Sequence, residues 1–136
     1  MSTLVVANLL DGRVVKGVSL DVDPARPVCH IRTDSGMEKV RLADAKALFF
    51  VRSLTGNKDR NDIQQAQPED IRAKGSARID LVFKDGERIA AFTNRYPPRG
   101  AYFFVVPVDT GSNNTRILVN AAALASMAPG VDSSGG

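Results

Sequence analysis

The dipeptide Asp-Gly occurs twice in this chain of 136 residues, at Asp11-Gly12 and Asp85-Gly86, and each copy lies between two apolar runs. A tight β-hairpin needs a residue with positive φ in its turn, and glycine adopts that conformation without steric cost. Asp-Gly between apolar runs is therefore a strong hairpin signal. The two copies are 74 residues apart. This spacing predicts that one β-rich unit occurs twice along the chain.

Further matches between the two halves support a duplication. At an offset of 74, residues 29–31 align with residues 103–105, and both segments have β-type composition. Farther along, an offset of 76 aligns Leu42 with Leu118 and assigns two extra residues to the polar loop at 109–114. Each half then reads as five short strands, with a short Ala-rich helical turn before the fifth.

We therefore predict an all-β fold made of two tandem small five-stranded barrels of the SH3 or Sm type, related by internal duplication and joined by a polar linker. Closure into a barrel removes exposed strand edges. Gly17 lies within the second strand, where a small barrel needs a sharp bend. The predicted segments are a first barrel at 1–52, a linker at 53–76, a second barrel at 77–128 and a disordered tail at 129–136. The linker is polar and its composition is compatible with a helical turn near residues 68–72.

The first strand is apolar on both of its faces, which is typical of a strand that is covered on both sides. It is expected to pack against the second barrel or against a partner chain. The predicted interface consists of large apolar side chains from the first and fifth strands, namely Leu4, Val6, Leu10, Phe49 and Phe50.

Composition limits the classes of function. The formal charge is +3, but residues 1–51, 52–76 and 77–136 each carry a net charge of +1, so no segment concentrates the basic residues as a phosphate-backbone binder usually does. A single cysteine, Cys29, excludes an intramolecular disulfide and a thiolate-rich metal site. We predict no metal and no cofactor.

A catalytic set cannot be assembled from this sequence. His30 is the only histidine and follows Cys29 directly. In a strand, adjacent side chains point to opposite faces, so these two cannot form a nucleophile–base pair. Gly-rich phosphate-binding loops are missing as well. We therefore predict that the protein is not an enzyme.

Two polar segments are candidates for binding a ligand or a partner. Arg95-Tyr96-Pro97-Pro98-Arg99 carries two arginines whose planar guanidinium groups suit phosphates and bases. Their spacing resembles the arginine motif of PilZ domains, although the Asp/Asn-x-Ser-x-x-Gly phrase of those domains is missing downstream. The other segment presents amides, a hydroxyl and a cation, although turn chemistry alone also explains such residues. The predicted binding residues are Arg95, Tyr96, Arg99, Ser112, Asn113, Asn114 and Arg116.

Several phrases of the chain resemble an uncharacterised bacterial domain family that is found alone or beside PilZ and response-regulator modules. They are residues 11–17, 44–51, 54–57, 82–87, 103–104 and 112–117. The resemblance implies a non-catalytic accessory module of bacterial signalling. The neighbouring PilZ modules suggest a link to cyclic di-GMP.

The function expected from the sequence is that of a non-catalytic signalling adaptor that binds a protein. Two alternatives remain open: a sensor of cyclic di-GMP or another nucleotide that uses Arg95 and Arg99, and an Sm-like RNA-binding protein with Tyr96 and Tyr102 as stacking residues. The N-terminus lacks a basic signal-peptide start, and the apolar run at 47–51 is too short to cross a bilayer. We therefore expect a cytoplasmic location.

Overall fold

A computed structural model describes residues 3–52, 77–94, 96–98, 100–108 and 113–130, which form ten β-strands and two 3-10 turns. The first half contains β1 (Thr3–Leu9), β2 (Val14–Ser19), β3 (Val28–Thr33), β4 (Gly36–Arg41), η1 (Leu42–Asp44) and β5 (Ala45–Val51). The second half contains β6 (Ala77–Phe83), β7 (Arg88–Thr93), β8 (Tyr102–Pro107), β9 (Asn114–Asn120), η2 (Ala121–Ala123) and β10 (Leu124–Pro129). The predicted all-β class is confirmed.

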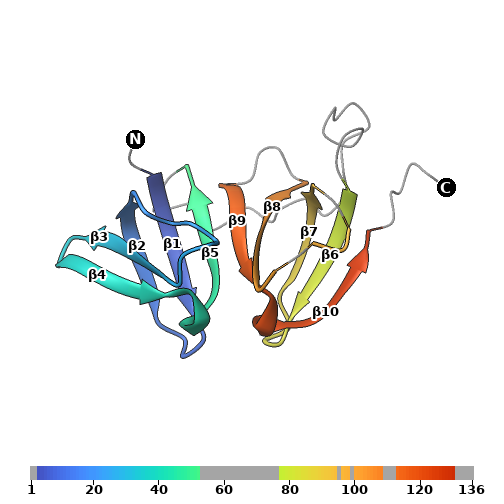
Figure 1. The fold of residues 1–136 in the computed structure, drawn as a ribbon, viewed down its shortest axis with the longest axis horizontal. Coiled ribbons are helices and arrows are strands. Elements are labelled where there is room, and N and C mark those ends of the chain that lie inside the picture. Colours follow the sequence, from blue (N-terminus) through green and yellow to red (C-terminus); the bar gives the residue numbers. More distant parts are fainter. Residues whose placement is uncertain (1–2, 53–76, 95, 99, 109–112, 131–136) are drawn as a thin grey trace.

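All ten strands belong to one antiparallel sheet in the order β10-β6-β7-β8-β9-β5-β1-β2-β3-β4. The predicted two tandem barrels are not confirmed, because β5 of the first half pairs with β9 of the second half and makes the sheet continuous. Figure 1 shows these two strands side by side in the middle of the molecule. The sheet is not closed, and its two edges are β4 and β10.

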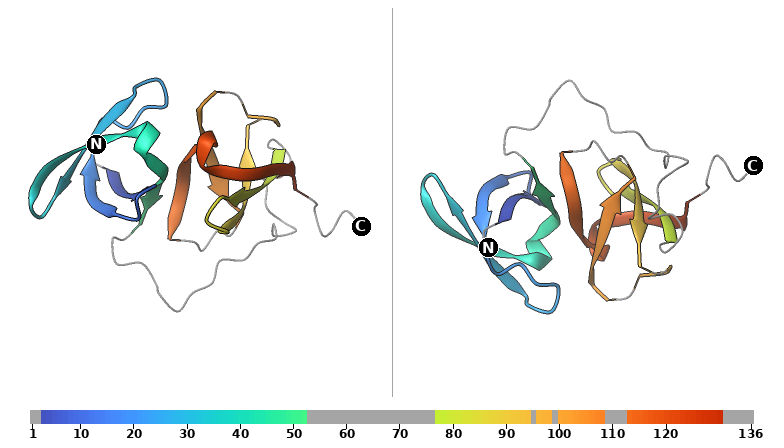
Figure 2. Two further views of the ribbon diagram at one scale, coloured as in Figure 1. Left: turned by 90° about the horizontal axis from the view of Figure 1, so that it is seen from below. Right: turned by 90° about the horizontal axis from the view of Figure 1, so that it is seen from above.

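The two halves have the same internal order, β5-β1-β2-β3-β4 and β10-β6-β7-β8-β9. Seen from above and below, each half curls on its own side of the central β5–β9 pair (Figure 2). The pairing registers also correspond, since Val28 pairs with Arg41 in the first half and Tyr102 pairs with Asn120 in the second. The same strand plan therefore occurs twice.

Backbone hydrogen bonds correct the alignment of the halves beyond the third strand. Leu42 N donates to Pro27 O in the first half, and Ala121 N donates to Ala101 O in the second, each at 2.9 Å. Leu42 therefore corresponds to Ala121, an offset of 79, and the predicted match with Leu118 at an offset of 76 is wrong. The second half has five extra residues between its third and fourth strands, not two, because identical side chains had been matched without the strand pairing.

Both Asp-Gly hairpins form as predicted, and Gly12 and Gly86 have φ of 94° and 96°. In the first hairpin, Leu9 N donates to Arg13 O, and the Asp11 carboxylate accepts from Arg13 N at 2.9 Å. The second hairpin has the same bonds 74 residues later. Three-residue loops of this kind place glycine in the left-handed region.

Gly17 has a packing role in β2. A Cβ atom built on it would lie 2.0 Å from the Arg32 carbonyl oxygen and 2.9 Å from Cγ2 of Ile31. The absence of a side chain thus allows β3 to cross β2 at close range.

Two hydrophobic clusters lie on the two sides of the central strands. In β5, Leu48 and Phe50 belong to the first cluster, and Phe49 belongs to the second. In β1, Leu4 and Val6 pack against the second cluster. Strands β1 and β5 are therefore covered on both faces within one chain. The second cluster combines Ala47, Phe49 and Val51 of β5 with residues of the second half.

The remaining predicted interface residue and the predicted tail are placed differently. Leu10 is 57% exposed in the hairpin turn. Strand β10 continues through Pro129, which the sequence assigned to the tail, and Gly130 N donates to Arg78 O. The predicted linker at 53–76 and the rest of the tail lie outside the described residues.

Candidate strand-addition site

Lys46 connects the two halves where β5 lies beside the second half. Asn8 pairs with Ala47 while Leu9 pairs with Ala45, so Lys46 is the extra residue of a β-bulge. A bulge re-aims a side chain. The Lys46 ammonium lies 4.8 Å from the centroid of the Phe83 ring, and its side chain is only 12% exposed.

The site that receives Lys46 is acidic. Its Nζ lies 2.7 Å from Oδ2 of Asp85 and also contacts the Glu87 carboxylate. Burial opposes the charge on the ammonium, but hydrogen bonds to Asp85 and Glu87 outweigh burial and raise the pKa of Lys46. The hydrogen bond from Lys46, with a second from Glu87 N, lowers the pKa of Asp85.

The backbone of the same segment is held by Asn120, which is buried in the second half. Its Nδ2 donates to Ala45 O at 2.9 Å, and its Oδ1 accepts from Ala122 N at 3.0 Å. The Asn120 side chain therefore binds the β5 backbone and also caps the start of the turn η2.

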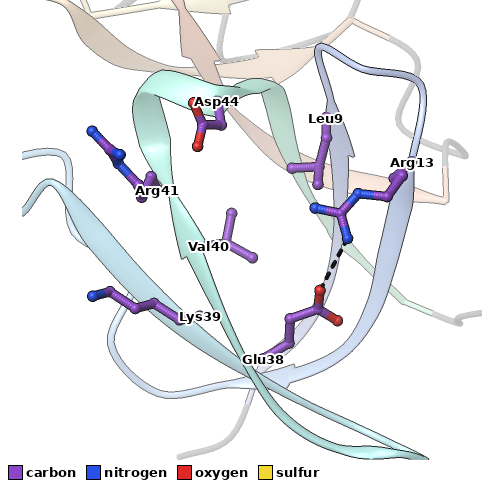
Figure 3. A pocket seen from close by; sticks show the side chains of 7 residues that line it. All are labelled: Leu9, Arg13, Glu38, Lys39, Val40, Arg41 and Asp44. Carbon is purple, nitrogen blue, oxygen red and sulfur yellow. Dashed lines mark hydrogen bonds and ion pairs between the residues drawn. The ribbon is translucent and has the colours of Figure 1, made fainter.

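The first half has an open pocket at its own fourth strand. It has a volume of about 190 Å³ and lies between the first hairpin, β4 and η1 (Figure 3). Within it, Arg13 Nη1 lies 3.4 Å from Oε1 of Glu38 and Arg13 Nε lies 3.1 Å from Oδ2 of Asp11. The lining residues come from these three elements: Leu9, Arg13, Glu38, Lys39, Val40, Arg41 and Asp44.

The pocket corresponds to the place that β5 occupies in the second half. With the offsets of 74 and 79, the counterparts of the lining residues are Phe83, Glu87, Ile117, Leu118, Val119, Asn120 and Ala123. Six of these seven residues contact or pair with β5. Phe83 and Glu87 contact Lys46, residues 117–119 pair with β5, and Asn120 donates to Ala45 O. The second half thus shows its site filled by a strand and a side chain. The same site in the first half is open among the described residues.

Strand β4 also presents its backbone for pairing. Because Leu42 N donates to Pro27 O, the preceding residue Arg41 directs its own N–H and C=O away from β3. By alternation, Lys39 and Met37 do the same. Such an unpaired row is a template for another strand.

The other edge, β10, is less suited to strand addition. Gly130 N donates to Arg78 O, so Pro129 turns its nitrogen to the outer edge, where proline has no N–H to donate. Proline on an edge strand limits pairing. The bulge position that corresponds to Lys46 is Ala125, which has no long side chain.

Part of the predicted binding cluster lies at the junction of the halves. Arg116 stacks over the Phe50 and Phe104 rings at 4.3 and 4.6 Å. Asn113 O accepts from Arg52 N, and Asn114 pairs with Val51 at the end of β5. These three residues thus contact β5 and its end, a contact within the chain.

The other predicted binding residues are elsewhere or undescribed. The Tyr96 hydroxyl donates to Met127 O at 3.3 Å, on the β10 side. Arg95, Arg99 and Ser112 lie outside the described residues, so the arginine pair of the nucleotide hypothesis stays a prediction. Tyr102, named for RNA stacking, is partly buried against the first cluster.

Cys29 and His30 point to opposite faces of β3. Cys29 is buried, and burial followed by the charge of Asp21 raises the pKa of its thiol to about 11. His30 Nδ1 lies 2.7 Å from Oδ2 of Asp21 on the exposed face. The Ser19 hydroxyl bonds to Asp21 and to His30 O, not to the imidazole ring. Among the described residues this set places no nucleophile beside the histidine.

Sequence reasoning missed the residues of this site. None of the site residues Lys46, Lys39, Asp44 and Arg13 was singled out from the sequence. An alignment of the halves at the offset of 79 would have placed Arg41 opposite Asn120 and shown that the fourth strands differ in polarity.

Comparisons with known proteins identify a family and nothing beyond it. The model of a family of unknown function, DUF6982, matches residues 1–129. No match was found among curated proteins or among solved structures. In the described part of the chain, no group of three or more His, Cys, Asp and Glu is placed to hold a metal ion. None of the helices in that part has the length and hydrophobicity that crossing a bilayer requires.

Proposed function

Because the chain belongs to DUF6982, a family of unknown function, we propose its function from geometry: it binds a protein by adding an extended segment of that partner to β4. The observation that carries the proposal is the β5–β9 pair. There, a fourth strand accepts a fifth strand from the other half, and Lys46 fills the site beside it. Strand addition uses main-chain hydrogen bonds for affinity and a side-chain pocket for specificity.

The chemistry of β4 supports a bound strand and not a reaction. Its outward amides and carbonyls supply hydrogen bonds, and the pocket beside it combines an apolar floor of Leu9 and Val40 with charged walls. The wall residue Arg13 is 64% exposed and holds its place through Asp11. The protein acts as a non-catalytic adaptor.

We also propose that each half is a small SH3- or Sm-like barrel and that the two arose by internal duplication. The common strand order, the common register and the equivalent long hydrogen bonds support this relation. The bacterial signalling context, with PilZ modules as neighbours and a cytoplasmic location, is a proposal that rests on the resemblance alone.

The test is hydrogen exchange on the intact chain with a selected binder. Peptides selected from a random display library are added to ¹⁵N-labelled protein, and amide exchange is followed residue by residue. Strand addition protects the outward amides of Met37, Lys39 and Arg41, because they gain partners. Binding that protects other amides and leaves these three unchanged would refute the proposal.

A matched pair of variants sharpens the test. Lys39→Pro removes one outward N–H without removing a β3–β4 hydrogen bond, so it should abolish binding. Lys16→Ala changes an exposed lysine on β2 and should leave binding unchanged. The amide spectrum of each variant checks that it is folded, and Lys39→Ala, which keeps the amide, should still bind.

A further inference from the structure

The open site in the first half differs from the filled site in the charge that it presents. In the second half, the positions around the bound lysine include Asp85 and Glu87 and no cation. In the first half, Arg13 takes the place of Glu87, Lys39 that of Leu118, and Arg41 that of Asn120. Counted over the seven lining positions together with the pair Asp11 and Asp85, the net charge changes from −2 to 0. The first half gains the three cations and the two anions Glu38 and Asp44, and loses the anion at the position of Glu87.

The apolar residue at the base of the site also changes in a way that disfavours a bound cation. Phe83, whose ring face attracts the Lys46 ammonium, is replaced by Leu9. An aliphatic side chain has no negative π-face, so the first half lacks the feature that favours a cation there. The second acidic partner, Glu87, is replaced by Arg13, whose guanidinium donors bind a carboxylate. The first acidic partner, Asp85, is retained as Asp11, which pairs with Arg13 at 3.1 Å, and Glu38 lies 3.4 Å from the same guanidinium.

We infer that the segment bound at β4 carries an acidic side chain at the position that Lys46 occupies in β5, so that its carboxylate pairs with Arg13 and Arg41. This inference rests on the proposed function and names the chemistry of its partner. On this proposal, the site in the second half binds a lysine of the same chain, whereas the site in the first half binds an aspartate or glutamate of a partner.

A second copy of this chain is the weaker occupant. One of its two edges is β10, where Ala125 stands at the position of Lys46 and supplies no carboxylate. Pro129 lacks the outward donor that continued pairing needs. If the second copy instead added its β4, it would bring the cations Lys39 and Arg41 to a site that already contains three cations. An acidic segment from another protein would supply both the backbone hydrogen bonds that β4 can make and a carboxylate for its cations.

The test uses three synthetic peptides and the intact protein. Each has the sequence of residues 42–51 with Phe49→Thr and Phe50→Thr for solubility, and position 46 is glutamate, lysine or alanine. Affinity is measured by amide shifts and exchange at Met37, Lys39 and Arg41. The glutamate peptide should bind about 3- to 10-fold more tightly than the lysine peptide at low salt, as expected for a few partly exposed ion pairs.

Variants of the protein complete the test. Arg13→Glu and, separately, Arg41→Glu should remove or reverse the preference, whereas Arg88→Glu, an exposed change on β7, should leave it intact. Equal affinities of the three peptides at β4, or a preference for lysine, would overturn the acidic specificity while the proposed function stands. If neither the three peptides nor the display-selected binders protect the β4 amides, both the acidic specificity and the proposed function are refuted.

Discussion

Reversing the charge of Lys46 tests whether this side chain fills a site that recognises charge. The variant Lys46→Glu places a carboxylate beside Asp85 and Glu87, over the Phe83 ring. It removes a cation–π contact worth about 0.5–2 kcal/mol and an ion pair with Glu87 worth about 0.2–1 kcal/mol. The pair with Asp85, whose side chain is 55% exposed, is screened by solvent and is left out of this figure. Like-charge repulsion adds to the loss, so we expect about 1–3 kcal/mol at neutral pH.

The compensating change follows from the first half, where Arg13 stands at the position of Glu87. Glu87→Arg alone removes an ion pair and places an arginine beside Lys46. Combined with Lys46→Glu, it creates a new pair of opposite charges. In the double-mutant cycle we expect a favourable coupling of at least about 0.5–1 kcal/mol, the size seen for residues in contact.

The assay is urea unfolding of the four proteins, with Lys16→Glu as the control for an exposed charge change. In thermal unfolding of the same proteins, each 1 kcal/mol corresponds to a shift in Tm of about 3–5 °C for a chain of this length. If Lys46→Glu were no more destabilising than Lys16→Glu, or if the coupling were zero, Lys46 would not join the halves as described. The equivalence between the filled site and the open pocket would then lose its basis.

Three further predictions concern packing, reactivity and pH. Gly17→Ala should cost about 1–3 kcal/mol in urea unfolding, because its Cβ meets the Arg32 carbonyl at 2.0 Å and a backbone group yields little; an unchanged midpoint would contradict this. Cys29, with a pKa of about 11 against an ordinary 9.0, should react with iodoacetamide at pH 8 roughly a hundredfold more slowly in the folded protein than in urea, and equal rates would show that it is accessible. Since the pKa of Asp85 lies below its ordinary 3.8, its pair with Lys46 stabilises the fold above that pH and is lost as the pH falls through the folded value. The stability difference between the native chain and Lys46→Met should therefore shrink below pH 3.8, and a constant difference down to pH 2 would count against the pair.

Local features of the fold were predictable because their causes are local. Asp11-Gly12 and Asp85-Gly86 specify hairpins through the backbone freedom of glycine. The opposite directions of Cys29 and His30 follow from β geometry. The two-sided apolar pattern of β1 likewise predicted that the strand would be covered on both faces, and each face packs against one of the two hydrophobic clusters.

The candidate site was not predictable, because it depends on pairing between segments far apart in the chain. Lys46 is one lysine among many in the sequence, and only the bulge in β5 directs it onto Phe83. The match of Leu42 with Leu118 was plausible by side-chain identity, yet the hydrogen bond to Pro27 O places Leu42 opposite Ala121. Register between distant strands is a property of the folded backbone.

The chain alone thus carries its class and its hairpins, since φ preferences and the two-residue period of a strand act between near neighbours. Tertiary structure decides that β5 adds to β9 and leaves β4 open, because backbone hydrogen bonds between remote strands carry no side-chain signature. The same pairing turns two similar strand plans into one filled site and one open site.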